Sequence, residues 1–209
     1  MSVTPKPKVV SAAEWQQARD ELLKAEKEAT RTLDAIAARR RRLPMVEFDN
    51  YTFATADGTT TLLDLFGDQV QLAVYQFMDR GPDQFCPGCT WFTNNVVNLD
   101  GLAENGVAWA TVSTMPITQI EAYKAEKGWT LPFVSSHGTS FAEDTGAGDG
   151  FGLSMFLRDG TDVYRTYHTN GRGVDRVLFV NNLLDLAPYG RQQDWEDSPV
   201  GWPQYPTYG

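Results

Sequence analysis

The sequence predicts an α/β protein in which helices flank a mixed central sheet. Residues 71–78, QLAVYQFM, and residues 106–114, GVAWATVST, are apolar runs of the length and continuity typical of buried central strands. Helical patterns separate and follow these runs, and strands that alternate with helices favour parallel pairs joined by crossovers. Two later alternating runs meet at Asp159-Gly160, which predicts an antiparallel hairpin and therefore a mixed sheet.

A long amphipathic helix is predicted near the N-terminus. Ser11 and Glu14 have the spacing of a capping box, and apolar residues then recur at steps of three and four. The helix should end near Arg42, because Pro44 disfavours helical backbone at the residue before it. A helix of this length cannot bury its apolar stripe against itself. We therefore expect residues 1–45 to form a helical arm that packs on the domain or on a second copy, giving a homodimer.

The charge of the chain excludes several function classes. Its formal net charge is -9, whereas a protein that binds nucleic acid usually presents a basic surface. The arginine run at 39–42 complements the dipole at the end of the predicted helix. No run approaches the roughly 20 apolar residues that span a bilayer, and no apolar signal segment opens the sequence. We expect a soluble, cytoplasmic protein that binds neither nucleic acid nor membranes.

Turn residues divide the rest of the chain into short elements. Residues 46–191 are expected to form one domain, and the Pro- and aromatic-rich residues 192–209 a C-terminal tail. The further elements expected are short strands within 46–55, one helical turn at 60–68, a helix at 90–102, a helix from Pro116 at N1 to Gly128, a short strand at 131–136 and an amphipathic helix at 173–186.

The only two cysteines follow the first central strand. Cys86 and Cys89 lie in the stretch DQFCPGCTWF. From residue 71 the order is strand, cysteine pair, helix, strand, helix, strand, strand, helix, which is the order of the thioredoxin fold. A Cys-x-x-Cys pair beside such a pattern is typical of redox proteins. In the cytoplasm such a pair is more often catalytic or metal-binding than a structural disulfide.

The spacing of the pair suits dithiol chemistry. With Cys86 at the N-cap and Pro87 at N1, the free N–H groups of the first turn and the helix dipole would stabilise a Cys86 thiolate. Cys89 would lie one turn further in, more buried and with a higher pKa. Cys86 would then attack a disulfide in a protein or a small molecule, and Cys89 would resolve the mixed disulfide. Gly88 leaves room for the partner's backbone.

Three alternatives remain open. Two thiolates and one or two imidazoles suit copper or zinc, so Cys86, Cys89, His137 and His168 are candidate metal ligands. The cysteines could also be buried thiols without a chemical role. The chain could finally be a non-catalytic interaction module that uses its arm and its tail.

Other residues are candidates for shaping the site. Asp83 could accept a proton from Cys89 or cap a loop, and Tyr75 and Trp91 are expected to be core or lining residues. The Gly-rich run at 146–152 precedes a strand, so it lacks the context of a phosphate loop and should give flexibility beside the site. The residues that we expect to shape the site are Asp83, Phe85, Pro87, Gly88, Trp91 and Leu153.

Several stretches occur in a specific combination. They are the predicted N-terminal helix, FCPGCTWFTNN, VSTMPITQIEAYKAEKGWTLPFVSS, DGFGLSMFLRDG and TYHTNGRGVDRVLFVNNLLDLAP. Together they resemble the bacterial "domain of unknown function 899" family over roughly residues 9–191. The resemblance implies a thioredoxin/peroxiredoxin-like fold, with the family's cysteine pair at Cys86 and Cys89. The family's label, a predicted dithiol-disulfide oxidoreductase, implies the activity.

The chain departs from patterns of the wider fold at three positions. Thioredoxins carry a cis-proline opposite the cysteine pair, where this chain has Gly152-Leu153-Ser154. Peroxiredoxins carry threonine three residues before the reactive cysteine, where Asp83 would raise the thiolate pKa and repel a peroxide anion. Family members commonly carry serine in place of His168. The departures argue against thioredoxin-type peptide docking and peroxidase activity, and they mark His168 as a specialised feature.

Overall fold

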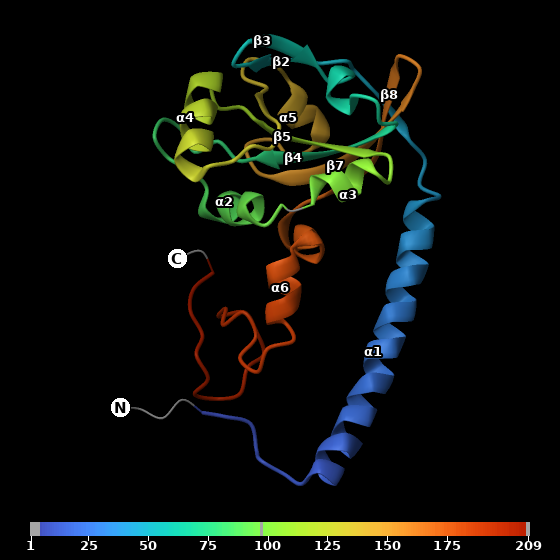
Figure 1. Ribbon diagram of the computed structural model, residues 1–209, viewed down its shortest axis with the longest axis vertical. Coiled ribbons are helices and arrows are strands. Elements are labelled where there is room, and N and C mark those ends of the chain that lie inside the picture. Colours follow the sequence, from blue (N-terminus) through green and yellow to red (C-terminus); the bar gives the residue numbers. More distant parts are fainter. Residues whose placement is uncertain (1–4, 97, 208–209) are drawn as a thin grey trace. The chain divides into compact units, whose positions relative to one another are not determined.

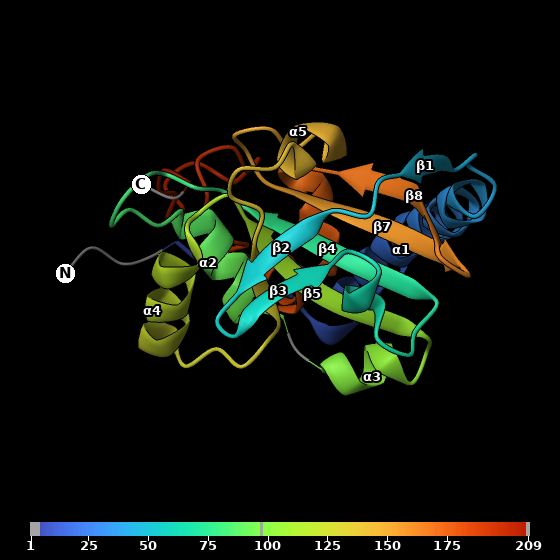
Figure 2. The same cartoon turned by 90° about the horizontal axis from the view of Figure 1, so that it is seen from above.

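The computed structural model of the chain describes residues 5–96 and 98–207. Within these residues the strands form one eight-stranded sheet in the order β1-β8-β7-β4-β5-β6-β2-β3 (Figures 1 and 2). The strands are β1 (Val46–Phe48), β2 (Thr52–Thr55), β3 (Gly58–Thr61), β4 (Gln71–Phe77), β5 (Val107–Ser113), β6 (Phe133–Ser135), β7 (Gly152–Asp159) and β8 (Asp162–Thr169). The helices are α1 (Ala12–Arg40), η1 (Asp64–Phe66), α2 (Pro87–Asn94), α3 (Leu99–Ala103), α4 (Ile117–Lys127), α5 (Phe141–Thr145), η2 (Gly171–Val177) and α6 (Phe179–Leu184), where η marks a 3-10 helix.

The chain divides into two compact units. The sheet belongs to the unit that comprises Met45–Asn182, and the other unit comprises the chain up to Pro44 together with Leu183–Thr207. In the second unit, the Tyr189 hydroxyl donates a 2.8 Å hydrogen bond to the backbone oxygen of Pro5. The sheet unit begins at Met45, and residues 183–191 group with the N-terminal segment. The division into arm, domain and tail stays a prediction.

The sheet is organised around β4. Six of its seven residues are buried, as expected for a central strand. It pairs in parallel with β5 and antiparallel with β7, and β7 and β8 form the hairpin predicted at Asp159-Gly160. The order β5-β4-β7-β8, with α2 between β4 and β5, is that of the thioredoxin fold. The predicted fold class is confirmed.

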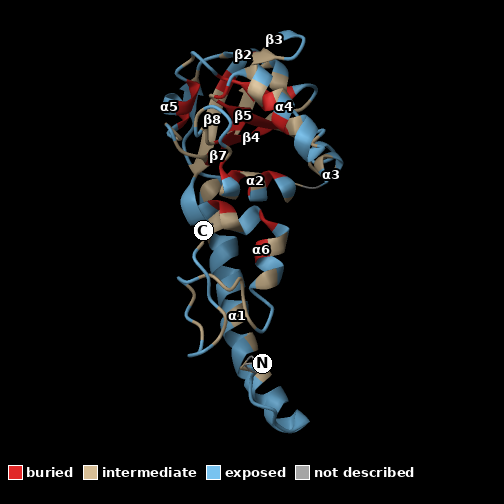
Figure 3. Cartoon of the chain, turned by 90° about the vertical axis from the view of Figure 1, so that its left-hand side faces the viewer, coloured by how far each residue is buried: buried red, intermediate tan, exposed pale blue. Residues whose placement is uncertain are grey.

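Two apolar clusters cover the two faces of the sheet. Tyr75 and Phe77 of β4 point to one face, where they meet side chains from α2, α4 and η2. Helices α2 and α4 share this face because consecutive right-handed crossovers run in one direction, from β4 to β5 to β6. Leu72 and Val74 point to the other face, toward η1 and α5. Figure 3 shows the buried residues in red along the strands and on the covering helices.

The N-terminal helix forms as its sequence predicts. In the capping box, the backbone N–H of Glu14 donates to the Ser11 hydroxyl at 3.3 Å, and the Glu14 carboxylate accepts from the Ser11 N–H at 3.0 Å. None of the residues of α1 is buried, and Trp15 of the apolar stripe is 58% exposed. The homodimer through this helix stays a prediction. A search of the described helices for one long and apolar enough to cross a membrane found none.

Two predicted helices are each interrupted. The helix expected at 90–102 ends with α2, and α3 begins only after Asn98, whose left-handed backbone (φ 58°) starts a new helix capped by its own side chain. The helix expected at 173–186 consists of η2 and α6. Leu178 separates them because its backbone is extended (φ -94°, ψ 108°). Pro116 is the N-cap of α4 rather than N1.

We expect Phe141→Ala to lower the free energy of unfolding by about 3–5 kcal/mol. Phe141 is fully buried, and its ring packs edge-on against Phe53 at 5.0 Å between centroids. Phe141 belongs to the apolar cluster that covers this face of the sheet. Urea unfolding of the full chain measures the loss. Val70→Ala is the control, since Val70 is 52% exposed and should change the value by less than about 0.5 kcal/mol.

Candidate functional site

The loop between β4 and the first cysteine is closed by a backbone bridge between its two ends. Residues 78–85 separate the strand from Cys86, and an isolated antiparallel bridge joins Asp79 to Phe85 across the base of this loop. The Asp79 carboxylate accepts from the Gly81 N–H at 2.8 Å, and the Gln119 amide of α4 donates to the Gly81 carbonyl at 3.1 Å. The loop is therefore fixed both to itself and to α4.

Aromatic packing then fixes the residue before the cysteine. The ring of Phe85 stacks on that of Tyr123 of α4, with centroids 3.5 Å apart and planes parallel. The Thr90 hydroxyl donates to the backbone oxygen of Cys86 at 2.9 Å and lies 2.8 Å from the Tyr123 hydroxyl. Tyr123 therefore contacts Phe85, which precedes Cys86, and Thr90, which binds the Cys86 carbonyl.

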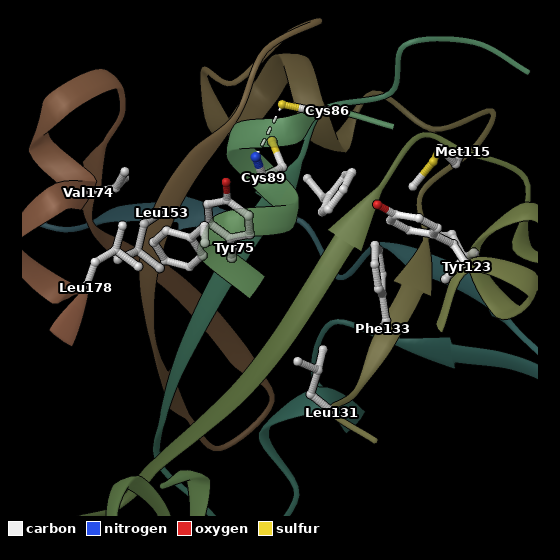
Figure 4. Packing of buried hydrophobic residues seen from close by; sticks show 13 residues of the cluster. Tyr75, Cys86, Cys89, Met115, Tyr123, Leu131, Phe133, Leu153, Val174 and Leu178 are labelled. Carbon is white, nitrogen blue, oxygen red and sulfur yellow. Dashed lines mark hydrogen bonds between the residues drawn. The ribbon is translucent and has the colours of Figure 1, made fainter. Parts of the chain in front are cut away.

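Cys86 is the N-cap of α2 and Pro87 is its first residue, as the sequence predicted. The Cys86 sulfur accepts a hydrogen bond from the backbone N–H of Cys89 at 3.3 Å, drawn as a dashed line in Figure 4. Its side chain is nearly buried, with 8% of the residue exposed. The sulfur therefore takes the place of the oxygen that usually caps a helix, at the positive end of the helix dipole.

These contacts lower the pKa of the Cys86 thiol to about 6. The largest cause is the hydrogen bond that the Cys89 thiol donates to it, and the backbone N–H groups of Cys89 and Gly88 add to it. The positive charge of Arg80 acts in the same direction, while burial opposes it. Because this value lies below neutral pH, Cys86 is mostly a thiolate at pH 7.

Cys89 has the opposite character. It is 1% exposed, and its pKa is raised, first by the hydrogen bond to the Cys86 sulfur and second by burial. Two donors oppose this rise, the Tyr75 hydroxyl and the backbone N–H of Met78, which lies 3.4 Å from the Cys89 sulfur. The two sulfurs thus share one proton, which stays on Cys89.

The structure brings only some of the predicted site-shaping residues together. Leu153 lies in the same apolar cluster as both cysteines and pairs with Tyr75 across β7 and β4. Trp91 points away from the pair, and its indole N–H donates to Asn181 of α6 at 3.0 Å. Asp83 lies on an exposed part of the loop with a left-handed backbone, φ 57°. With Phe85 it lines a groove of about 430 Å³ along α4.

Neither histidine joins the cysteine pair. The exposed ring of His137 lies 3.0 Å from the backbone oxygen of Thr114. His168 pairs with Ser154, which pairs with Val74, so the imidazole lies on the face of the sheet opposite Tyr75 and the cysteines. Within residues 5–96 and 98–207, no three His, Cys, Asp or Glu side chains gather closely enough to hold a metal ion. The predicted four-ligand set is not assembled.

Sequence reasoning missed the polar contacts that the site receives from β4 and α4. Tyr75 was expected only to be a core or lining residue, but its oxygen points toward Cys89 and lowers the pKa of that thiol (Figure 4). Tyr123 and Thr90 were not singled out. One signal was present in the sequence: a tyrosine inside a strand of almost continuous apolar residues carries a hydroxyl that needs a partner when it is buried.

Comparison with known protein families gives a match over nearly the whole chain. The family described as "Bacterial protein of unknown function (DUF899)" matches residues 4–208. The chain belongs to the DUF899 family. The match extends beyond the resemblance seen in the sequence at both ends, and it includes most of the C-terminal tail. A comparison of this DUF899 chain with curated proteins found no match.

Solved structures show limited similarity to this DUF899 chain. A hypothetical protein from Sinorhizobium meliloti is 19% identical, with 60% of this chain and 69% of that chain covered and a TM-score of 0.44. The bacterioferritin comigratory protein of Xanthomonas campestris is 17% identical over 62% and 88%, with a TM-score of 0.43. A secreted Mycobacterium tuberculosis disulfide oxidoreductase homologous to DsbE is 14% identical over 56% and 84%, with a TM-score of 0.39.

We expect the rate of Cys86 alkylation by iodoacetamide to rise as the pH passes through about 6 and to level off near pH 7.5. The lowered pKa makes the thiolate the main form above this midpoint, whereas an ordinary thiol titrates near pH 8.5. Peptide mapping would assign the label. In Cys89→Ala the sulfur loses its largest stabilising contact, so the midpoint should rise toward 8.5. A midpoint near 8.5 in the unmutated protein would contradict the assignment.

Gly152 lies against the imidazole ring of His168. A Cβ at Gly152 would lie 2.6 Å from Cε1 of the imidazole, so Gly152→Ala should destabilise the protein by about 1–3 kcal/mol. His168→Ala removes the obstructing ring, and the double variant should recover much of the loss. A double-mutant cycle by urea unfolding measures this coupling. Additive effects of the two substitutions would show that the ring is not the obstacle.

Proposed function

We propose that this protein is a thiol-disulfide oxidoreductase in which Cys86 is the nucleophile and Cys89 the resolving thiol. The observation that carries the proposal is the asymmetry of the pair. The Cys86 sulfur caps a helix, and its pKa is lowered to about 6, while the Cys89 sulfur is buried and its pKa is raised. A nucleophilic thiolate beside a protonated thiol is the arrangement that disulfide exchange requires.

In the first step the Cys86 thiolate attacks one sulfur of a substrate disulfide. A Cys86–substrate disulfide forms, the substrate S–S bond breaks, and the second substrate sulfur leaves as a thiolate. Attack is favoured because the thiolate is already present at neutral pH, and of the two buried cysteines Cys86 is the more exposed, 8% against 1%. The substrate is a disulfide in a protein or in a small molecule.

In the second step Cys89 displaces the substrate. Once Cys86 is part of a disulfide, it no longer carries the negative charge that holds the proton on Cys89. Cys89 loses this proton to solvent or to a departing thiolate, and its sulfur attacks Cys86. The products are the Cys86–Cys89 disulfide and two reduced substrate sulfurs. A cellular dithiol returns the pair to the reduced state, which fits the cytoplasmic location expected from the sequence.

The helix supplies the geometry for ring closure. Cys86 and Cys89 are three residues apart across the first turn of α2, so their side chains lie on the same side of that turn. Pro87 at N1 fixes the backbone between them and has no N–H that would need a partner. Neither cysteine has to leave its helix for the disulfide to form.

Trapping the mixed disulfide tests the proposal. The reduced chain would be mixed with hydroxyethyl disulfide and analysed by intact mass and peptide mapping. We expect the unmutated protein to end as the Cys86–Cys89 disulfide, Cys89→Ser to retain one substrate half on Cys86, and Cys86→Ser to react at least about 100-fold more slowly.

Native mass spectrometry of protein purified without reductant or chelator separates the alternatives. Reversible loss of two hydrogens supports the dithiol. A bound copper or zinc ion that is lost in Cys86→Ser would overturn it in favour of a metalloprotein. Cysteines that neither form a reversible disulfide nor bind a metal ion would also overturn it, in favour of the non-catalytic interaction module.

A further inference from the structure

Tyr75 occupies a central position beneath the cysteine pair. It lies on β4, paired in parallel with Thr111 of β5 and antiparallel with Leu153 of β7, and it is 1% exposed. Its ring lies flat on that of Phe92 of α2, with centroids 3.8 Å apart and planes 7° from parallel. The phenol is therefore held between the sheet and the helix.

The stacking directs the hydroxyl to the second cysteine. Phe92 follows Cys89 by three residues, so both side chains lie on the face of α2 that packs on β4. A ring stacked on Phe92 can extend one turn back along the helix, which places the Tyr75 hydroxyl where it lowers the pKa of the Cys89 thiol. Figure 4 shows the Tyr75 oxygen pointing toward Cys89. The backbone N–H of Met78 donates to the same sulfur at 3.4 Å.

We propose that Tyr75 is a catalytic residue of the second step, in which its hydroxyl donates a hydrogen bond to the Cys89 thiolate as that sulfur attacks the mixed disulfide. The inference rests on the proposed function and deepens it. Cys89 lies in an apolar cluster, where an unpaired thiolate would lose its hydration and be strongly disfavoured. A hydrogen bond from the Tyr75 hydroxyl would lower this cost.

The proton balance of the step follows from these contacts. In the reduced protein the Cys89 S–H donates to the Cys86 thiolate. In the mixed disulfide that acceptor has lost its charge, and the Cys89 proton passes to solvent or to the departing thiolate. The Tyr75 O–H and the Met78 N–H then both donate to the Cys89 sulfur. Tyr75 acts only as a hydrogen-bond donor in this step and transfers no proton.

The other titratable groups near Cys89 have different partners. In the same apolar cluster, Cys86 is consumed in the first step, and the Tyr123 hydroxyl contacts Thr90. Arg80 of the loop acts on Cys86. Tyr75→Phe would keep the stacking on Phe92 and remove the hydroxyl that points toward Cys89, so this substitution tests the role of the hydroxyl.

The test compares the two steps in Tyr75→Phe by rapid mixing of the reduced chain with hydroxyethyl disulfide, acid quench and intact mass. We expect the first step and the alkylation profile of Cys86 to stay within about twofold. Resolution of the mixed disulfide should slow by roughly 10- to 100-fold at pH 7, because a hydrogen bond to a charged sulfur is lost. The pH at which resolution reaches half its maximal rate should rise.

Tyr51→Phe is the matched control, because its hydroxyl contacts Asp144 on the opposite face of the sheet. It should leave both steps unchanged. A second measurement uses Cys86→Ala, in which Cys89 is the only thiol: thiolate absorbance should titrate at a higher pH when Tyr75→Phe is added. The hydroxyl would be purely structural if Tyr75→Phe lowered thermal stability but changed neither the pH midpoint of resolution nor that of the Cys89 titration. This result would overturn the inference.

The outcomes also separate the inference from the proposed function. A mixed disulfide that forms in the unmutated protein and resolves equally fast in Tyr75→Phe would overturn the role of Tyr75 alone. Failure of the unmutated protein to form any mixed disulfide would overturn the oxidoreductase function and this inference with it.

Discussion

The hydrogen bonds between the two cysteines are the interaction on which the site depends. The Cys89 backbone N–H and the Cys89 thiol both donate to the Cys86 sulfur, so Cys89 supplies both the N–H that the cap satisfies and the largest stabilisation of the thiolate. Both contacts require that Cys86 end an extended segment and that the helix begin at Pro87. The loop that precedes Cys86 and the stacking of Phe85 on Tyr123 hold the backbone where it changes from extended to helical.

The sheet provides the second half of the arrangement by contacting Cys89. The backbone N–H of Met78, directly after β4, donates to the buried sulfur, and the Tyr75 hydroxyl of β4 lowers the pKa of the Cys89 thiol. The two thiols differ because Cys89 donates to the Cys86 sulfur and is more deeply buried, while the contacts from β4 and Met78 partly oppose the rise in the Cys89 pKa. The parallel pairing of β4 with β5 keeps α2 on the face where Tyr75 points.

Local rules predicted much of this structure. A proline at N1 and a cysteine before it locate the start of α2, and Asp159-Gly160 locates the hairpin, because neither feature depends on distant residues. The features that escaped prediction depend on tertiary packing. The side of the sheet on which His168 lies follows from register across two strand pairs. The approach of Tyr75 to Cys89 depends on how α2 packs on β4, and the spacing of residues in the sequence does not determine this packing.

Both cysteines lie inside an apolar cluster of the sheet unit, so under the proposed function the redox state of the pair would be linked to the folding of that unit. Each donor that stabilises the Cys86 thiolate stabilises the reduced protein and has no such partner once the sulfurs are joined. By thermodynamic linkage, whatever the reduced fold gains over the oxidised fold appears in the reduction potential, since reduction releases that free energy. In the proposed exchange the helix cap would therefore act on the equilibrium as well as on the rate, and its contribution to the equilibrium would favour the reduced pair.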